Sequence, residues 1–400
     1  MNPPQAGPLD GIRVLDLTRA LAGPYCTMFL GDMGAEVAKI EQPRVGDDSR
    51  GWGPPFIGDQ SAYFLAINRN KKSLAIDLKT RQGAGLVRRL ACKADVLIEN
   101  FRPGTMERFG LGEAELRALN PRLIYASVSG FGADGPMKDW PGYDIIIQAW
   151  GGFMSITGRP DGEPTKVAVA IIDIVAGLML GKAIGAALFA RERTGLGQKI
   201  DTSLLEAEVA CLIPYGSDYL ATGKVPGRNG NAHPNIVPYQ SFNSSDGYLV
   251  VGAASEGNWQ RLCQAIGKPE LASDPRFANN AQRVAHRKEL IGVLTGVFLE
   301  RDTASWIRLL GEAGVPCAPV NTIDQVFSDP QVLHRNMLLE IDHPAAGRVR
   351  MAGMPVKFSA TPGTIRLPPP LLGQHTEEVL QEWLDVSDSD IAEFKTQGVI

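Results

Sequence analysis

The chain has 400 residues, of which 44% are hydrophobic, and a formal net charge of −4. This length exceeds what one small hydrophobic core needs and predicts two or three domains. A charge so close to zero argues against nucleic acid or an anionic membrane surface as a partner. The five cysteines are odd in number and widely spaced, so they predict neither a disulfide framework nor a zinc knuckle. They favour a reducing compartment, and because residues 1–11 lack the features of a secretory signal, we expect the cytoplasm.

Short β-rich runs alternate with helical patterns along the first half of the chain. We expect strands at 12–18, 36–41, 73–78, 95–100, 123–131 and 199–204, with helices between them. Strands that alternate with helices are typical of a parallel sheet, here one α/β domain over about 1–205. The opening turn lacks the G-x-G-x-x-G pattern, which argues against a nicotinamide or flavin site.

The second half of the chain has a different pattern. A helix is expected from Leu204 towards Ala221, so that 206–225 forms a linker helix before a loop rich in glycine and proline. A hairpin turned at Ser-Asp-Gly and three helical patterns then predict a smaller α+β domain over 226–325. Residues 326–400 predict a return linker, two strands around a turn, a proline-rich connector and two final helices.

One carboxylate, Asp173, interrupts a long apolar stretch. The β-branched run at 167–172 predicts a buried strand, and the small residues after Asp173 predict a tightly packed helix. Asp173 then either caps this helix or faces a cleft at the carboxyl ends of the strands, and both roles are compatible. About 20 apolar residues also suffice for a membrane span. Because Asp173 and Lys182 lie within the stretch, a buried helix of a soluble domain fits better.

Nine motifs follow one another along nearly the whole chain: VLDLTRALAGP, GAEVAKIEQP, NRNKKS, ADVLIENFRPG, GYDIIIQAWGGFMSITG, IIDIVAG, RTGLGQKID, AGVPCAPV and LLGQHTEEVL. Each motif is weak alone, but in this order they resemble the class III CoA-transferases, also called the CaiB/BaiF or formyl-CoA transferase family. Within the family, the stretches DDSRGWGPPFIG, NRNKKSLAID, AHPNIVPYQSF and LPPPLLGQH are most similar to the succinyl-CoA:glutarate type.

The resemblance implies a discontinuous, Rossmann-like large α/β domain with the smaller α+β domain inserted into it. The large domain would consist of 1–205 together with the C-terminal part of 326–400. The resemblance also implies an interlocked homodimer, in which each chain threads the central opening of the other.

Asp173 falls where this family has its catalytic aspartate, so the resemblance implies that Asp173 is the nucleophile. Its carboxylate would attack an acyl-CoA thioester and relay the group through a mixed anhydride and an aspartyl-CoA thioester. We expect succinyl-CoA as the donor and a small dicarboxylate such as glutarate as the acceptor. The chemistry uses coenzyme A but no metal and no general base, because the acceptor is already ionised near pH 7. We also expect the helix N-terminus to keep Asp173 ionised.

The resemblance assigns the coenzyme A contacts to a set of residues scattered over the large domain: Ala20, Ile76, Asn100, Phe101, Arg108 and Leu204. Arg108 would contact the phosphates, and Lys71 and Lys72 are further candidates, with a solvated loop as the equal alternative. Gln42 stands where the family has a cofactor-contacting arginine. Leu21 stands where other members have a substrate-site glutamine, which makes oxalate less favoured.

The acceptor site has three candidate residues. Asp144 matches an acidic position of the family, with helix capping or pairing as the alternative. The second charge of a dicarboxylate needs a partner, which Arg228 or His233 in the linker loop would supply. An α-methylacyl-CoA racemase shares the fold, but Tyr143 replaces its acid/base histidine. A non-catalytic acyl-CoA-binding protein is the other alternative, and it would not need Asp173.

Overall fold

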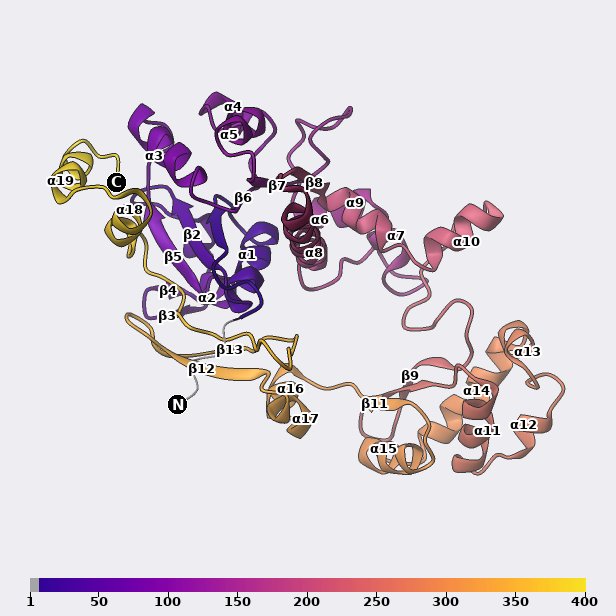
Figure 1. Cartoon of the computed structure of the whole chain (residues 1–400). Coiled ribbons are helices and arrows are strands. Elements are labelled where there is room, and N and C mark those ends of the chain that lie inside the picture. Colours follow the sequence, from indigo (N-terminus) through magenta and orange to yellow (C-terminus); the bar gives the residue numbers. More distant parts are fainter. Residues whose placement is uncertain (1–6) are drawn as a thin grey trace. The chain divides into compact units, whose positions relative to one another are not determined.

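Figure 1 shows the computed structural model of the protein, which describes residues 7–400. Helices and strands pack into two compact units. The larger unit comprises the chain up to Phe153, Val167–Ser217 and Pro330–Ile400, and the smaller unit comprises Met154–Lys166 and Asp218–Asp329. The larger unit is therefore discontinuous in sequence, and the chain enters the smaller unit twice.

A six-stranded sheet, parallel throughout, lies at the centre of the larger unit (Figure 1). Its strand order is β5-β2-β1-β6-β7-β8. The strands are β1 Arg13–Asp16, β2 Glu36–Glu41, β5 Lys71–Ala75, β6 Val96–Glu99, β7 Ile124–Ser129 and β8 Lys199–Ser203. All six expected strands are thus confirmed, with ends within about three residues of the expected ones. Because the chain builds outward from β1 in both directions, the sheet has a topological switch point between β1 and β6.

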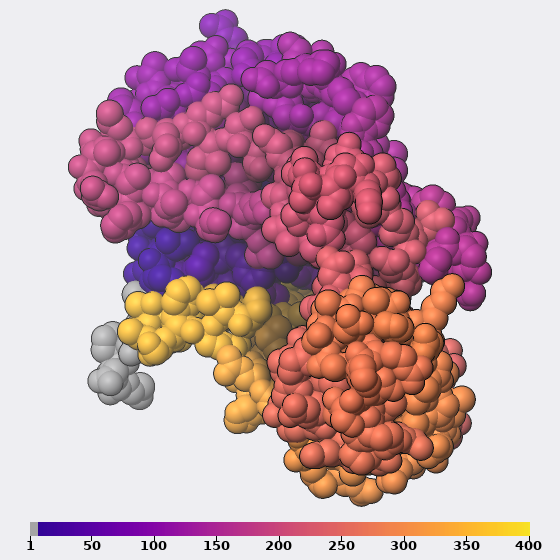
Figure 2. All heavy atoms as spheres, turned by 90° about the vertical axis from the view of Figure 1, so that its right-hand side faces the viewer, coloured from indigo at the N-terminus to yellow at the C-terminus, as the bar shows by residue number. Residues whose placement is uncertain are grey.

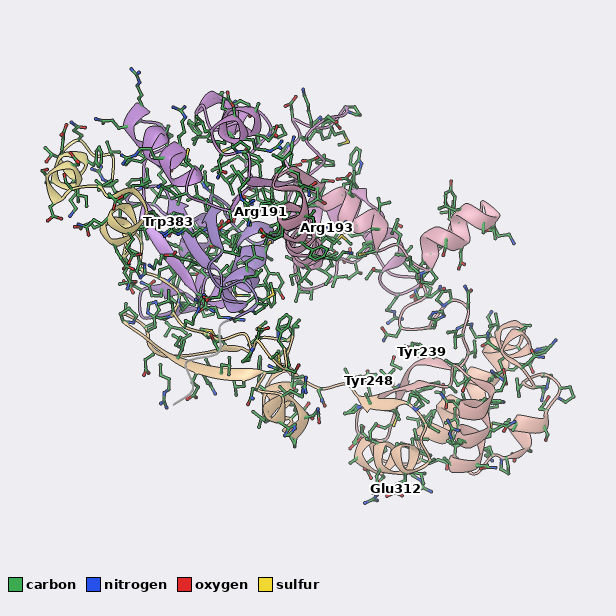
Figure 3. The ribbon with its side chains drawn as sticks, viewed as in Figure 1. Arg191, Arg193, Tyr239, Tyr248, Glu312 and Trp383 are labelled. Carbon is green, nitrogen blue, oxygen red and sulfur yellow. The ribbon has the colours of Figure 1, made fainter. Side chains whose placement is uncertain are left out.

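Helices cover both faces of this sheet. One face carries α1 Ala22–Asp32, α8 Ile171–Thr194 and α9 Leu204–Ala210, and the other carries α3 Arg81–Ala91, α5 Glu113–Leu119, α18 Thr376–Leu384 and α19 Asp388–Thr396. Successive strand residues face opposite cores, so Val14 packs with α1 and α8 and Leu15 with α3 and α18. Trp383 on α18 is buried, with the guanidinium carbon of Arg13 4.9 Å from its ring centre (Figure 3).

α8 is the longest helix of the larger unit. Within residues 7–400 it is the one helix that is long and apolar enough to cross a membrane by length and composition, and 39% of its apolar window is buried. It packs closely across α1, because a Cβ atom at Gly177 would lie 2.5 Å from the Ala22 carbonyl oxygen. Arg191 near its end is buried and forms a 2.9 Å ion pair with Asp95 (Figure 3). These contacts make α8 a core helix of the α/β unit.

The smaller unit has its own sheet and its own core. Strands β9 Tyr239–Asn243, β10 Tyr248–Gly252 and β11 Cys317–Pro319 form an antiparallel sheet in the order β11-β10-β9. The helices α11 Glu256–Ala265, α14 Arg287–Phe298 and α15 Thr303–Glu312 bury Trp259, Phe298 and Trp306 against it. Figure 2 shows the surface of the smaller unit as a closely packed body, with its later residues in orange. The hairpin and the three helices expected from the sequence are confirmed.

Shorter elements complete the two units. They are η1 Asp48–Gly51, β3 Phe56–Ile57, β4 Gln60–Ser61, α2 Ala62–Ile67, α4 Thr105–Arg108, α6 Asp144–Trp150, α7 Phe153–Ile156, α10 Tyr215–Thr222, α12 Glu270–Ser273, α13 Asn280–Ala285, α16 Ile323–Ser328 and α17 Pro330–His334. The antiparallel pair β12 Leu338–His343 and β13 Gly347–Ala352 confirms the expected C-terminal hairpin.

Two expectations about secondary structure are wrong. Residues 167–170 form no strand, because the Val167 N–H donates to the side chain of Gln148 instead of to a neighbouring strand, and the helix begins at Ile171. The helix expected from Leu204 to Ala221 is two helices, α9 and α10. Pro214 lies between them and has no N–H with which to continue α9.

Candidate active site

A pocket of about 290 Å³ opens at the carboxyl ends of β1, β6, β7 and β8. It lies at the switch point of the sheet, where open α/β sheets bind their ligands. Its walls come from the segments that follow these strands, together with Asp48, Trp52, Tyr63, Asp173 and Leu204. All of these residues belong to the larger unit.

The loops after β1 and β6 hold each other across the switch point. The Arg19 N–H donates to Oδ1 of Asn100 at 2.9 Å, and Nδ2 of Asn100 donates to the Arg19 carbonyl at 2.8 Å. The next residue, Ala20, has a φ of 63°, which is rare for a residue other than glycine. Its N–H donates to Oδ1 of Asp47 at 3.2 Å. A strained backbone held on both sides is typical of a functional loop.

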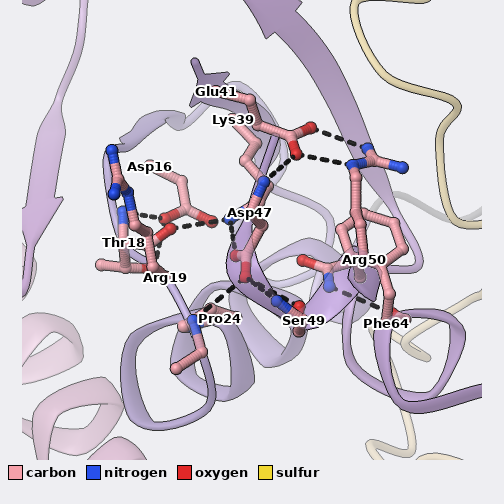
Figure 4. A network of polar contacts seen from close by, with 12 residues as sticks. Asp16, Thr18, Arg19, Pro24, Lys39, Glu41, Asp47, Ser49, Arg50 and Phe64 are labelled. Carbon is pink, nitrogen blue, oxygen red and sulfur yellow. Dashed lines mark hydrogen bonds and ion pairs between the residues drawn. The ribbon is translucent and has the colours of Figure 1, made fainter. Parts of the chain in front are cut away.

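A network of buried charges supports these loops (Figure 4). The Lys39 ammonium lies 2.8 Å from Oδ2 of Asp47 and donates to the Thr18 carbonyl at 2.7 Å. Glu41 accepts two hydrogen bonds from the guanidinium of Arg50. Burial opposes these charges, but their mutual attraction holds the pKa of Asp47 at about 2 and lowers that of Glu41. The network therefore remains ionised at neutral pH.

Asp173 lies in the first turn of α8 and contributes to the pocket. Burial and then the charge of Asp144 raise its pKa to about 7, although the helix N-terminus favours the anion. The expectation that the helix N-terminus keeps Asp173 ionised stays a prediction, since burial and the charge of Asp144 act against it. Nor does Asp173 cap α8, since the cap position is Ala170. Within residues 7–400 its carboxylate accepts no hydrogen bond, so it is not engaged in holding the fold.

A second pocket of about 220 Å³ adjoins the first. Arg19 and Phe101 line both, and the guanidinium carbon of Arg19 lies 5.2 Å from the Phe101 ring centre. Ile76, Gln42 and Lys79 line the second pocket alone. Together the two pockets offer apolar side chains and cations, with the carboxylates of Asp173, Asp48, Glu41 and Asp77 also in their walls. Such a surface suits a long ligand that carries phosphates.

Comparison with known proteins decides between the possible ligands. A model of CoA-transferase family III matches residues 9–376. The chain belongs to this family. It is 45% identical to the succinyl-CoA:glutarate CoA-transferase of Mus musculus over 98% of this chain and 90% of that protein. It is 43% identical to the succinate–glutarate CoA-transferase of Agrobacterium fabrum, over 95% of this chain and 96% of that protein.

Solved structures agree with this assignment. A CaiB/BaiF family protein from Brucella suis superposes with a TM-score of 0.83 at 43% identity, covering 95% of this chain and all of that chain. The protein Rv3272 from Mycobacterium tuberculosis gives a TM-score of 0.83 at 33% identity, over 93% and 99% of the two chains. The motif-based prediction of a class III CoA-transferase that uses an acyl-CoA as substrate is thus confirmed.

The CoA-transferase pockets contain most of the residues expected to contact coenzyme A. Ala20, Asn100, Phe101 and Leu204 line the pocket of Asp173, and Ile76 lines the adjoining one. Arg108 lines neither pocket, but its exposed guanidinium donates to the hydroxyl of Thr105, which does line the adjoining one. Gln42, which stands where the family has a cofactor-contacting arginine, also lines this second pocket.

The two lysines of NRNKKS are placed less favourably. Lys71 is fully buried, with its ammonium 3.2 Å from Asp16 and donating to Asn68 and to the Pro24 carbonyl. Lys72 pairs with three carboxylates, those of Glu36, Glu378 and Glu382. Neither lysine lines either pocket, so their contacts support a role in stabilising the fold.

Arg228 and His233, the candidate anchors for the acceptor, belong to the smaller unit. The Arg228 guanidinium donates to the carbonyls of Arg159 and Gly162. His233 accepts from the Asn235 N–H through Nδ1, and its ring lies 5.5 Å from that of Tyr239. Both side chains therefore already have local partners.

The sequence reasoning missed several pocket residues. Arg19, Arg102 and Lys138 line the pocket of Asp173, and within residues 7–400 none of them forms an ion pair. Tyr63 lines the same pocket as Asp173, and burial, followed by the charges of Asp173 and Asp144, raises the pKa of Tyr63 to about 12. Arg19 and Arg102 stand within the motifs VLDLTRALAGP and ENFRPG, which would have identified them. Within residues 7–400, no group of three or more histidine, cysteine, aspartate or glutamate side chains is placed to hold a metal ion.

Proposed function

We propose that this protein transfers coenzyme A from succinyl-CoA to a small dicarboxylate such as glutarate. Asp173 carries this proposal, as a partly buried carboxylate without a hydrogen-bond partner among the described residues, in the wall of a pocket at the carboxyl ends of the strands. The relatives named as succinyl-CoA:glutarate CoA-transferases, which cover nearly the whole chain, support the choice of substrates.

The reaction proceeds by covalent relay through one carboxylate. An oxygen of Asp173 attacks the thioester carbon of succinyl-CoA, the C–S bond breaks, and CoA thiolate leaves a mixed anhydride behind. The thiolate then attacks the aspartyl carbonyl and expels succinate, which leaves an aspartyl-CoA thioester. A carboxylate of glutarate attacks the aspartyl carbonyl of that thioester, the C–S bond breaks, CoA thiolate is expelled again, and a second anhydride forms. Attack of the thiolate on its glutaryl carbon gives glutaryl-CoA and restores the carboxylate.

The raised pKa of Asp173 suits both halves of this relay. A more basic carboxylate is a better nucleophile, provided that enough of it is ionised, and a pKa near 7 meets both demands at neutral pH. Tyr63 keeps its proton at this pH and so remains able to donate a hydrogen bond to a developing oxyanion.

Coenzyme A would lie along the two adjoining pockets. Ala20, Asn100, Phe101 and Leu204 would contact its pantetheine arm near Asp173, with Ile76 against the adenine. Three cations would meet the phosphates, namely Arg19 and Lys79 in the pocket walls and Arg108 beside Thr105. Lys79 and Arg19 compensate for the arginine that Gln42 replaces.

The second carboxylate of the acceptor needs a cation, because an unpaired buried charge costs several kcal/mol. Arg102 and Lys138 lie on the wall of the pocket that holds Asp173 and have no acidic partner among the described residues. They are better candidates than Arg228, whose guanidinium is bound to backbone carbonyls.

We also propose a homodimer, interlocked as in the family, that acts in the cytoplasm. The larger unit leaves large apolar side chains exposed on neighbouring helices, including Ile145 and Ile146 on α6, Leu178 and Phe189 on α8, and Val209 on α9. A second copy of the chain would cover this apolar surface.

Trapping the covalent intermediate tests the nucleophile directly. The protein is incubated with succinyl-CoA without an acceptor, digested at low pH and examined by mass spectrometry. The peptide containing Asp173 should carry the mass of coenzyme A bound as a thioester, and hydroxylamine should remove it. Asp173→Ala is the control. Labelling of any other carboxylate in the parent protein would refute the assignment.

A further inference from the structure

The first turn of α6 holds the chain on both sides of the turn that leads into α8. Oδ1 of Asp144 accepts from the Ile172 N–H at 2.8 Å, one residue before Asp173. Oδ2 accepts from Nε2 of Gln148 at 2.6 Å. Oε1 of Gln148 in turn accepts from the Val167 N–H at 2.8 Å. Asp144 is 8% exposed and Gln148 is fully buried, so water does not compete for these bonds.

We propose that Asp144 and Gln148 form a positioning clamp, which fixes Asp173 for attack on the thioester and also sets the charge that surrounds it. This inference rests on the proposed role of Asp173 as the nucleophile. In this proposal Asp144 holds the backbone next to Asp173 and does not contact the acceptor acid.

The geometric part of the clamp follows from how α8 begins. A helix starts with N–H groups that have no partner within the helix, and a polar side chain at the cap position normally accepts from one of them. Here the cap position is Ala170, which has no acceptor, and Asp144 supplies the missing oxygen from another helix. With Val167 held by Gln148 as well, both ends of the turn before Asp173 are fixed. Displacing a reacting group by about 1 Å can cost about a hundredfold in rate.

The electrostatic part follows from the charges that face Asp173. Asp144 on α6 is the neighbouring carboxylate that raises the pKa of Asp173, and it also acts on Tyr63 and on Glu208 of α9. The pocket wall adds Asp48 and the cations Arg19, Arg102 and Lys138. Tyr25 and Cys26 on α1 have raised pKa values and stay neutral near pH 7. Asp144 is therefore the carboxylate whose charge acts on Asp173 and whose charge a substitution can remove.

The two parts are separable by substitution. Asp144→Asn keeps an acceptor oxygen for the Ile172 N–H and removes the charge, but it also loses the bond from Nε2 of Gln148, because two amide donors would then face each other. Gln148→Leu keeps the charge of Asp144 but removes the hydrogen bonds from Gln148 to Asp144 and to the Val167 N–H. When Asp144→Asn is combined with Gln148→Glu, the carboxylate moves to position 148, where its oxygens can accept from the new side-chain amide and from the Val167 N–H. Asp139→Asn, an exposed acid on the preceding loop that lines neither pocket, is the matched control.

The test is the pH profile of kcat/KM for CoA transfer by the full-length enzyme, with the melting temperature of each variant recorded. Asp144→Asn should move the acid limb of the profile to lower pH, a change that a structural role alone would not cause. Gln148→Leu should lower kcat at least about tenfold while KM for succinyl-CoA and the acid limb stay the same. The double variant Asp144→Asn with Gln148→Glu should have a higher kcat than the single variant Asp144→Asn, because it restores hydrogen bonds between positions 144 and 148 and to the Val167 N–H. Asp139→Asn should change none of these values.

Two results would overturn the clamp. One is an acid limb that stays at the same pH in Asp144→Asn, provided that the variant melts as the parent does. The other is an unchanged kcat in Gln148→Leu. Both would leave the nucleophile assignment standing if Asp173→Asn is inactive. Activity in Asp173→Asn within about tenfold of the parent would instead reject the proposed function itself.

Discussion

The ammonium of Lys39 lies 2.8 Å from Oδ2 of Asp47, and neither side chain has any exposed surface. The pair connects the sheet with both sides of the active-site pocket. Lys39 belongs to β2, while the other oxygen of Asp47 accepts from the Ala20 N–H and from the Ser49 N–H of η1. The conformation of Ala20, which is unfavourable for alanine, is thus held by a charge pair in the core.

Removing one charge of this pair should destabilise the protein and loosen the Ala20 loop. For Asp47→Asn we expect a loss of about 3 kcal/mol in the free energy of unfolding, since breaking a buried pair removes the carboxylate that acts most strongly on Lys39. The dissociation constant for coenzyme A should rise as well. Urea denaturation and calorimetric titration measure the two effects. In the double variant with Lys39→Met, the loss of stability should be smaller than the sum of the two single losses, and a simple sum would mean that the pair does not couple.

Activity should depend on the ionisation of Asp173. Because only the carboxylate attacks the thioester, and the pKa of Asp173 is raised to about 7, kcat/KM should fall as the pH drops through 7. An ordinary aspartate near pKa 3.9 would give no such limb above pH 6. The profile is measured with succinyl-CoA and glutarate between pH 5 and pH 9. A flat profile down to pH 5 would contradict the raised pKa.

The same shift predicts how stability depends on pH. Asp173 has a higher pKa in the folded state than in the unfolded state, so between about pH 4 and pH 7 the folded protein binds the extra proton. The contribution of this group to stability is therefore greatest at low pH and is lost as the pH rises through 7. Asp173→Asn removes this loss, and its melting temperature should exceed that of the parent more at pH 8 than at pH 5. An equal difference at both pH values would contradict this linkage.

Much of the fold was predictable because its signals are local. The six central strands are short apolar runs between helical patterns, and their burial on both faces makes these runs nearly continuous. The run 167–172 has the same composition but forms no strand. Its backbone is held by Asp144 and Gln148, which lie 28 and 19 residues before the residues that they bind. A contact between distant side chains leaves no local trace in the sequence, so strand propensity gave the wrong answer.

In the candidate active site, too, contacts between residues far apart in the chain could not be predicted from the sequence. The motif around Asp173 predicted the nucleophile, but the pKa of Asp173 depends on burial and on Asp144, and neither follows from residue spacing. Lys71 and Lys72 look alike in NRNKKS, yet Lys71 is sealed in the core and Lys72 pairs with three acids. Their alternation on β5 sends the two side chains to opposite faces, and the buried acid Asp16 is what retains Lys71.

Coenzyme A binding should depend on Arg108. Arg108→Ala should weaken the binding of free coenzyme A by about 1.5–3 kcal/mol, which is typical of lost charge-assisted hydrogen bonds to phosphate. The comparison with dephospho-CoA locates the contact, because the variant should lose less affinity for this ligand if Arg108 meets the 3′-phosphate. Arg122→Ala, an exposed arginine away from both pockets, is the control. An unchanged dissociation constant for coenzyme A would place the phosphates elsewhere.

The preference for a dicarboxylate should depend on Lys138 and Arg102. Both side chains line the pocket of Asp173 without an acidic partner among the described residues, so the distal carboxylate of glutarate would be their partner. We expect Lys138→Ala and Arg102→Ala to raise KM for glutarate at least about tenfold, equivalent to about 1.4 kcal/mol, by losing one charge-assisted contact. KM for pentanoate, which has the same length but a single charge, should stay within about twofold.

The matched control for this prediction is Lys224→Ala, since Lys224 is exposed and lies in the smaller unit. Arg228→Ala is the informative comparison, because its guanidinium is occupied by the carbonyls of Arg159 and Gly162. Equal losses with glutarate and pentanoate in the Lys138 and Arg102 variants would mean that these cations bind coenzyme A and not the acceptor. A selective loss for glutarate in Arg228→Ala alone would move the anchor to the smaller unit. Faster turnover of pentanoate than of glutarate by the parent enzyme would refute the dicarboxylate assignment. With pentanoate bound, the anchoring cation would have no partner, whereas the second carboxylate of glutarate would pair with it, so glutarate should be the better acceptor.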